Sequence, residues 1–230
     1  MNDSNTKFVA DQKEWSIVSK ELEDENIKLA YYDHTLIPLL GNVGNKKILD
    51  YGAGPGVLAL ALKKLGANVK VYDINPEMAE KAGQKIGSEN VYNFLNQIPK
   101  DHFDLIINNL VLCIVPEQEV RDIVLNIAYI LNENGLAYIG FCNPLIFNIP
   151  ESNLDFRFPT GNKYEDNHNY KKIKKEGGYE IIESHRPIEW YEQVFEDVGL
   201  NILDKIFTPE YELKGSKIKD FIIFKLQKNG

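Results

Sequence analysis

The sequence is poor in cysteine, with only two such residues, Cys113 and Cys142. Both lie within apolar runs, where a free cysteine behaves as a small buried hydrophobic residue. Two isolated cysteines provide neither a disulfide framework nor the ligand spacing of a known metal motif. We therefore expect a reduced protein that binds no metal ion.

Long hydrophobic runs are also missing. Nowhere do 18 apolar residues follow one another, and residues 1–14 are too polar for the core of a signal peptide. These two features predict a cytoplasmic protein that does not associate with a membrane.

Basic residues are fewer than acidic ones. The sequence has 26 Lys and Arg residues and 34 Asp and Glu residues, so its net charge is −8. Such a protein does not attract nucleic acid through its overall field, so we do not expect a nucleic-acid partner. A short lysine-rich run at 171–175 is the local exception.

The chain is long enough, at 230 residues, for one α/β domain with a sizeable core. Between 46 and 142 the pattern alternates between short apolar strands and amphipathic helices, which is typical of parallel βαβ units covered on both faces. The expected strands are 47–50, 69–73, 90–94, 103–107 and 136–141, and the expected helices are 57–65, 76–86 and 120–131.

The remaining parts of the single predicted domain surround this core. Residues 1–45 form an N-terminal helical cap, with one helix around Trp15 and another over 30–40. Residues 143–184 break the alternation and contain a hairpin at Gly177-Gly178. Residues 185–230 supply a helix from Pro187 and two antiparallel strands, 200–207 and 219–226, because their connection is too short for a parallel crossover.

The most informative stretch is the glycine loop that follows the first core strand. It reads Asp50-x-Gly52-x-Gly54-x-Gly56 and opens a helix, so backbone N–H groups and a positive helix end meet there. Asp73 follows Gly52 by 21 residues, at the end of the second core strand. A dinucleotide fingerprint needs G-x-G-x-x-G/A, and Val57 occupies its third glycine position.

These residues resemble the class I S-adenosylmethionine-dependent methyltransferases over roughly 30–142 and the closing helix and hairpin. The resemblance implies a Rossmann-like, doubly wound sheet of seven strands, mostly parallel with an antiparallel C-terminal strand and helices on both faces. It also implies S-adenosyl-L-methionine as the cofactor. The resemblance implies that Gly52, Gly54 and Gly56 contact the methionine portion, and that Asp50 orients the loop or meets the ammonium through water. It implies Asp73 for the ribose hydroxyls, Phe94 and Leu95 for the adenine, and Asn108 near the sulfonium, with Ala53 and Ile74 as further cofactor contacts.

Methyl transfer needs alignment more than acid–base chemistry, so the acceptor site leaves few marks in the sequence. His185 is the expected base, with capping of the following helix as the alternative, and His168 is a second candidate. Tyr32 is expected at the cofactor or substrate, or in helix packing. Arg186 would hold an anionic substrate or pair with a nearby glutamate.

These features predict methyl transfer to an oxygen or nitrogen of a small molecule. The alternatives are a tRNA or protein methyltransferase, a non-catalytic S-adenosylmethionine-binding regulatory or assembly subunit, and a dinucleotide oxidoreductase. The 143–184 insertion would be the lid that determines the substrate, or the contact of a homodimer, because aromatic side chains serve both purposes.

Overall fold

The computed structural model describes residues 7–9, 27–148, 156–157, 161–174 and 179–229. The expected helix around Trp15 and the Gly177-Gly178 turn lie outside these residues. Among the helices that are described, none has the length and apolar character needed to cross a membrane.

A seven-stranded sheet forms the centre of the fold, in the order β10-β13-β6-β5-β2-β3-β4. Only β13 runs antiparallel to its two neighbours among these strands, as the sequence predicted for the C-terminal strand. The strands are β2 (Lys47–Tyr51), β3 (Asn68–Tyr72), β4 (Val91–Tyr92), β5 (Phe103–Asn109), β6 (Leu131–Cys142), β10 (Leu200–Phe207) and β13 (Phe221–Lys228).

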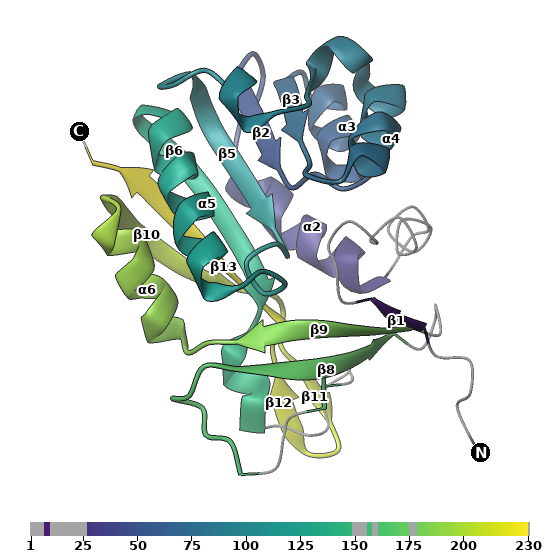
Figure 1. Ribbon diagram of the computed structural model, residues 1–230, viewed down its shortest axis with the longest axis vertical. Helices are drawn as coiled ribbons and strands as arrows, with labels where there is room; N and C mark the ends of the chain where they lie inside the picture. The colour runs from purple at the N-terminus through teal and green to yellow at the C-terminus, as the bar shows by residue number, and fades with distance from the viewer. Residues whose placement is uncertain (1–6, 10–26, 149–155, 158–160, 175–178, 230) are drawn as a thin grey trace.

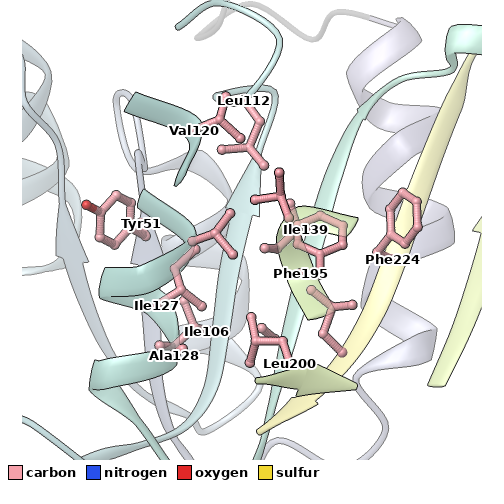
Figure 2. Packing of buried hydrophobic residues seen from close by; sticks show 14 of the residues in the cluster. Tyr51, Ile106, Leu112, Val120, Ile127, Ala128, Ile139, Phe195, Leu200 and Phe224 are labelled. Atoms are coloured by element: carbon pink, nitrogen blue, oxygen red, sulfur yellow. The ribbon is translucent and has the colours of Figure 1, made fainter. Parts of the chain in front are cut away.

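Helices cover both faces of this sheet and create two apolar cores (Figure 1). On one face α5 (Glu117–Ile130) and α6 (Ile188–Asp197) bury apolar side chains against β5, β6 and β13. Figure 2 shows Phe195 of α6 packed with Ile139 and Phe224 in this core. The other core is built by α2 (Ile27–Leu39), α3 (Val57–Lys64) and α4 (Pro76–Ile86). The predicted doubly wound, Rossmann-like fold is therefore confirmed.

Local sequence signals explain where the helices near the glycine loop begin and end. Asn75 caps α4, since its side chain accepts hydrogen bonds from the N–H groups of Glu77 and Met78, and Pro76 occupies the first helical position. Gly66 follows α3 with a φ of 89°, a left-handed conformation that glycine adopts without strain.

The structure differs from the sequence predictions in several boundaries. The third core strand is only two residues long, and β6 begins at Leu131 because this residue already pairs with Phe103. Short 3₁₀ helices span Ser88–Asn90, Leu95–Gln97 and Pro144–Asn148. The connection between the last two strands carries a small hairpin of β11 (Tyr211–Leu213) and β12 (Ser216–Ile218).

A second sheet comes from the insertion and the N-terminal segment, in the order β1-β9-β8-β7. The strands β8 (His168–Lys174) and β9 (Tyr179–His185), which flank the expected turn, pair antiparallel, and β7 (Phe156–Arg157) lies beside β8. The N-terminal strand β1 (Lys7–Val9) pairs in parallel with β9. Figure 1 shows β8 and β9 beyond the carboxyl ends of β2 and β5, where ligands of such sheets bind.

Candidate active site

The glycine loop between β2 and α3 takes a backbone conformation that only glycine adopts easily. Gly52, Gly54 and Gly56 have φ values of 81°, 52° and 76°. A Cβ atom on Gly52 would overlap the Val111 side chain, and one on Gly56 would lie 2.9 Å from Ala82. The loop is therefore packed closely against its neighbours and presents main chain to a ligand.

Asp73 ties this loop to the start of α4. Its Oδ2 atom accepts a hydrogen bond of 2.8 Å from the Gly54 N–H, and its Oδ1 atom accepts one of 2.9 Å from the Asn75 N–H. Burial raises the pKa of this carboxyl, whereas the two backbone hydrogen bonds lower it. The neighbouring main chain is held too, because the Gly52 and Ala53 N–H groups donate to the Tyr72 carbonyl.

Two buried polar atoms at the ends of β2 and β5 lack a hydrogen-bond partner among the described residues. They are Oδ2 of Asp50, a residue that is 3% exposed, and Oδ1 of Asn108, which is fully buried. The Asn108 amide nitrogen donates to the Tyr51 carbonyl at 2.8 Å, which fixes the side chain. Buried polar groups normally have partners, so these atoms indicate a place where a polar ligand binds.

Three carboxyl groups come near one another around this place. Burial raises the pKa of Asp50 to about 8, with further increases from the charges of Asp33 and Asp73. Burial also raises the pKa of Asp33, on α2, to about 6, although nearby His34 lowers it. Like charges held together in a poorly solvated place favour a cationic ligand. Asp33, which follows Tyr32 in the sequence, was not among the residues predicted for the site.

Apolar side chains lie beyond the ends of β3 and β4. Ile74, Phe94 and Leu95 are 55%, 65% and 38% exposed. Ile74 and Phe94 each follow by two residues the paired positions Tyr72 and Tyr92 of the two strands. The expected adenine contacts are thus exposed at the same edge of the sheet as Asp73.

Tyr32 fixes α2 to the central sheet. It is 1% exposed, and its hydroxyl donates a hydrogen bond of 2.6 Å to Oδ1 of Asn109. A Cβ atom on Gly140 of β6 would overlap this hydroxyl, so the tyrosine needs a glycine beneath it. Burial raises the pKa of Tyr32 well above its ordinary value, which keeps the hydroxyl protonated. These contacts are those of helix packing, one of the two roles expected for Tyr32.

The loop after β5, which begins next to Asn109, is held in an unusual backbone conformation. Leu110 has a φ of 58°, a left-handed value that a large non-glycine residue rarely adopts. Its N–H donates to the Gly140 carbonyl at 2.7 Å. Such conformations gather at functional sites because the surroundings must hold them.

His185 and His168 come together in the second sheet, where they are paired residues of β9 and β8. Their ring centroids lie 4.9 Å apart. His185 is the last residue of β9, whereas the sequence predicted a turn at this position. Its Nε2 atom lies 2.7 Å from the Tyr164 carbonyl oxygen. The carbonyl can only accept, so Nε2 carries the proton. Burial lowers the pKa of His185, which favours the neutral ring.

Arg186 is buried and braces the loop that follows β5. Its guanidinium donates to the carbonyl oxygens of Leu112 at 3.0 Å and Val115 at 2.7 Å, and to the Tyr191 hydroxyl at 3.3 Å. The guanidinium is thus committed to main-chain carbonyls, which differs from the anion-binding role expected of it. Beside Arg186 and His185 lies a cavity of about 10 Å³, which is about the size of one water molecule.

Comparison with known proteins identifies the class to which this fold and site belong. The family described as "Methyltransferase domain" matches residues 24–204. Because this match spans more than half of the sequence, the chain belongs to that family. It is a class I S-adenosylmethionine-dependent methyltransferase, in agreement with its glycine loop and its sheet.

Solved structures share the fold at low sequence identity. A methyltransferase from Methanosarcina mazei, described as SAM-dependent, is 22% identical with a TM-score of 0.63, over 84% of this chain and 97% of that one. A 1,6-didemethyltoxoflavin-N1-methyltransferase from Burkholderia thailandensis is 14% identical with a TM-score of 0.59, over 96% and 92%. That structure holds 1,6-didemethyltoxoflavin and S-adenosylhomocysteine.

Curated relatives match only a part of the sequence. A ribosomal protein L11 methyltransferase from Paraburkholderia phytofirmans is 36% identical over 69 residues, which are 28% of this chain and 23% of that protein. The chain therefore spans about a quarter of the length of this relative, and the match leaves the acceptor open.

Proposed function

We propose that this methyltransferase uses S-adenosyl-L-methionine to methylate an oxygen or nitrogen of a small molecule. The observation that carries the cofactor assignment is the buried Asp50 carboxyl, whose Oδ2 atom lacks a partner among the described residues and lies close to two other acids. The cofactor carries an ammonium group and a sulfonium centre, and such positive charges favour ionised carboxylates nearby.

The residues around Asp50 also suit the other parts of the cofactor. Asp73 offers carboxylate oxygens at the end of β3 for the ribose hydroxyls, and the glycine loop offers main chain for the methionine portion. The exposed side chains of Ile74, Phe94 and Leu95 suit a flat apolar base. Asn108 would lie near the sulfonium.

When bound, the cofactor would supply a methyl group bonded to a positively charged sulfur, which leaves as a neutral thioether. The protein then has to align the acceptor with that methyl group and to exclude water. We assign water exclusion to α2, which Tyr32 holds against β5 and β6, and to the β8–β9 sheet beyond the carboxyl ends of the strands. His185, oriented by the Tyr164 carbonyl, is our candidate for taking a proton from the acceptor, and the tilted ring of His168 lies beside it.

A small acceptor agrees with how the carboxyl end of the sheet is covered. The backbone N–H of Ser184 in β9 donates to the Cys113 carbonyl in the loop after β5, at 2.7 Å. This bond ties the insertion sheet to the rim of the site. The Burkholderia thailandensis enzyme, which resembles this chain along most of its length, binds a small heterocycle. The net charge of −8 argues against tRNA as the acceptor.

The experiment is to incubate the protein and a cell extract with S-adenosylmethionine labelled in its methyl group. We expect label in the low-molecular-mass fraction, and clearly less of it when Asp73→Ala replaces the wild type at a low cofactor concentration. Label found only in acid-precipitable protein or RNA would overturn the small-molecule proposal and favour the alternative acceptors. Binding of S-adenosylhomocysteine without any incorporation would favour the non-catalytic alternative.

A further inference from the structure

Three side chains that bind metal ions in other proteins meet in the interior, away from the glycine loop. They are Cys113, Cys142 and Glu183, whose two sulfur atoms and one carboxylate oxygen all lie within 4.8 Å of one another. The three residues are 4%, 6% and 3% exposed. They come from the loop after β5, the end of β6 and strand β9, so only the folded chain brings them together.

The surrounding contacts hold these three residues in place. The Ser184 N–H donates to the Cys113 carbonyl at 2.7 Å, which fixes the position after Glu183 against the loop that carries Cys113. The Tyr170 hydroxyl donates a hydrogen bond of 2.5 Å to Oε2 of Glu183 and orients its carboxylate. Cys142 is held by its pairing with Phe221 of β13. A ligand set supported by such outer contacts is the arrangement that metal sites require.

We propose that Cys113, Cys142 and Glu183 form a zinc site that joins the insertion sheet to the carboxyl ends of β5 and β6. Two thiolates and a carboxylate are a ligand set that suits Zn²⁺, which prefers four ligands in a tetrahedron. Zinc–ligand bonds of about 2.0–2.3 Å separate tetrahedral ligands by about 3.4–3.8 Å, so a small inward shift completes the geometry. Both cysteines also line the cavity of about 10 Å³, which has room for a water molecule as the fourth ligand.

Charge and protons balance in this site. Both thiols release their protons to solvent when zinc binds, and the weak hydrogen bond of 3.6 Å from the Cys113 sulfur to the Leu110 carbonyl is lost. The two thiolates, the carboxylate and Zn²⁺ together carry one negative charge. The Arg186 guanidinium, bonded to the carbonyls of Leu112 and Val115 on either side of Cys113, supplies a positive charge close by.

The test uses the full-length protein, reduced, freed of metal and titrated with Co²⁺ and then Zn²⁺. We expect one Co²⁺ per chain, with the thiolate-to-cobalt charge-transfer absorption of a cysteine site, and its displacement by Zn²⁺. At a Zn²⁺ concentration of about 100 times Kd, Tm should rise by about 5–11 °C. Absence of the charge-transfer band in reduced wild-type protein with Co²⁺ would overturn the proposal. So would a Cys113–Cys142 disulfide that forms, under oxidising conditions, to the same extent with excess Zn²⁺ as without it.

Variants identify the ligands. Glu183→Gln should weaken Zn²⁺ binding by at least about tenfold, and Cys142→Ser should abolish the charge-transfer band. The exposed Glu133 on β6 provides the matched control, since Glu133→Gln should leave binding unchanged. Equal affinities of Glu183→Gln and Glu133→Gln would overturn the three-ligand site. If Cys142→Ser does not fold, the spectrum of the wild type and the titration of Glu183→Gln still test whether the zinc site exists. None of these readouts depends on methyl transfer.

Discussion

The ionisation of Asp50 should make cofactor binding depend on pH. Burial and the neighbouring acids raise the pKa of this carboxyl to about 8, so most molecules of the free protein hold it protonated at neutral pH. A cationic group bound beside it favours the ionised form, because opposite charges stabilise each other in a poorly solvated site. Binding therefore requires the loss of a proton, and affinity should increase as the pH rises toward 8.

The magnitude follows from the fraction of Asp50 that is already ionised. With a pKa of about 8, this fraction is about 3% at pH ~6.5 and about 24% at pH ~7.5. If only the ionised form binds, affinity rises about eightfold over this interval, which is about 1.2 kcal/mol of binding free energy. The increase levels off above the pKa, where ionisation is nearly complete.

Isothermal titration calorimetry with S-adenosylhomocysteine at several pH values measures this dependence. Repeating each titration in buffers of different ionisation enthalpy counts the protons released. Asp50→Asn is the matched control, because it keeps the shape of the side chain and cannot ionise.

The difference between the two proteins therefore isolates Asp50. The wild type should release more protons at pH ~7 than Asp50→Asn and should show the steeper gain in affinity. Equal pH dependence and equal proton release in the two proteins would refute the assignment of Asp50 to a cationic part of the ligand.

Three further substitutions test other parts of the site and the fold. Asp73→Ala should weaken S-adenosylhomocysteine binding by about 1.5–3 kcal/mol, the cost of losing a charged hydrogen-bond partner, and unchanged affinity in calorimetry would contradict its role. Phe94→Ala should weaken binding by about 1 kcal/mol through lost aromatic contact, with Tm unaltered because the side chain is exposed. Gly140→Ala forces the Tyr32 hydroxyl to move and should lower the free energy of unfolding by about 1–3 kcal/mol in denaturant titrations. In the control Gly44→Ala, the added methyl group meets only the Asn42 side chain, and a loss of stability equal to that of Gly140→Ala would show that the Tyr32 contact is unimportant.

The sequence was sufficient for the central sheet and the cofactor loop because their signals are local. Strand and helix periods, the Asn75-Pro76 cap and the glycine spacing each depend on a few consecutive residues. The antiparallel β13 was also predictable, since its connection to β10 is too short for a crossover.

Contacts between distant segments were not predictable in the same way. Nothing in the sequence around Arg186 indicates that its guanidinium turns toward the carbonyls of Leu112 and Val115. Likewise, Cys113 and Cys142 have no motif spacing, and only the fold brings Glu183 between the elements that carry them. Asp33 became a candidate only when α2 placed it near Asp50.

The parallel pairing of β1 with β9 has a consequence for how the site opens. Residues 7–9, which precede α2 in the chain, share a sheet with residues 179–181 of the insertion. The β1–β9 pairing thus ties a segment that precedes α2 in the chain to the edge of the insertion sheet, to which we assign part of the covering of the site. Weakening the β1–β9 pairing should then loosen the insertion sheet at that edge and change the rate at which the acceptor enters and the methylated product leaves.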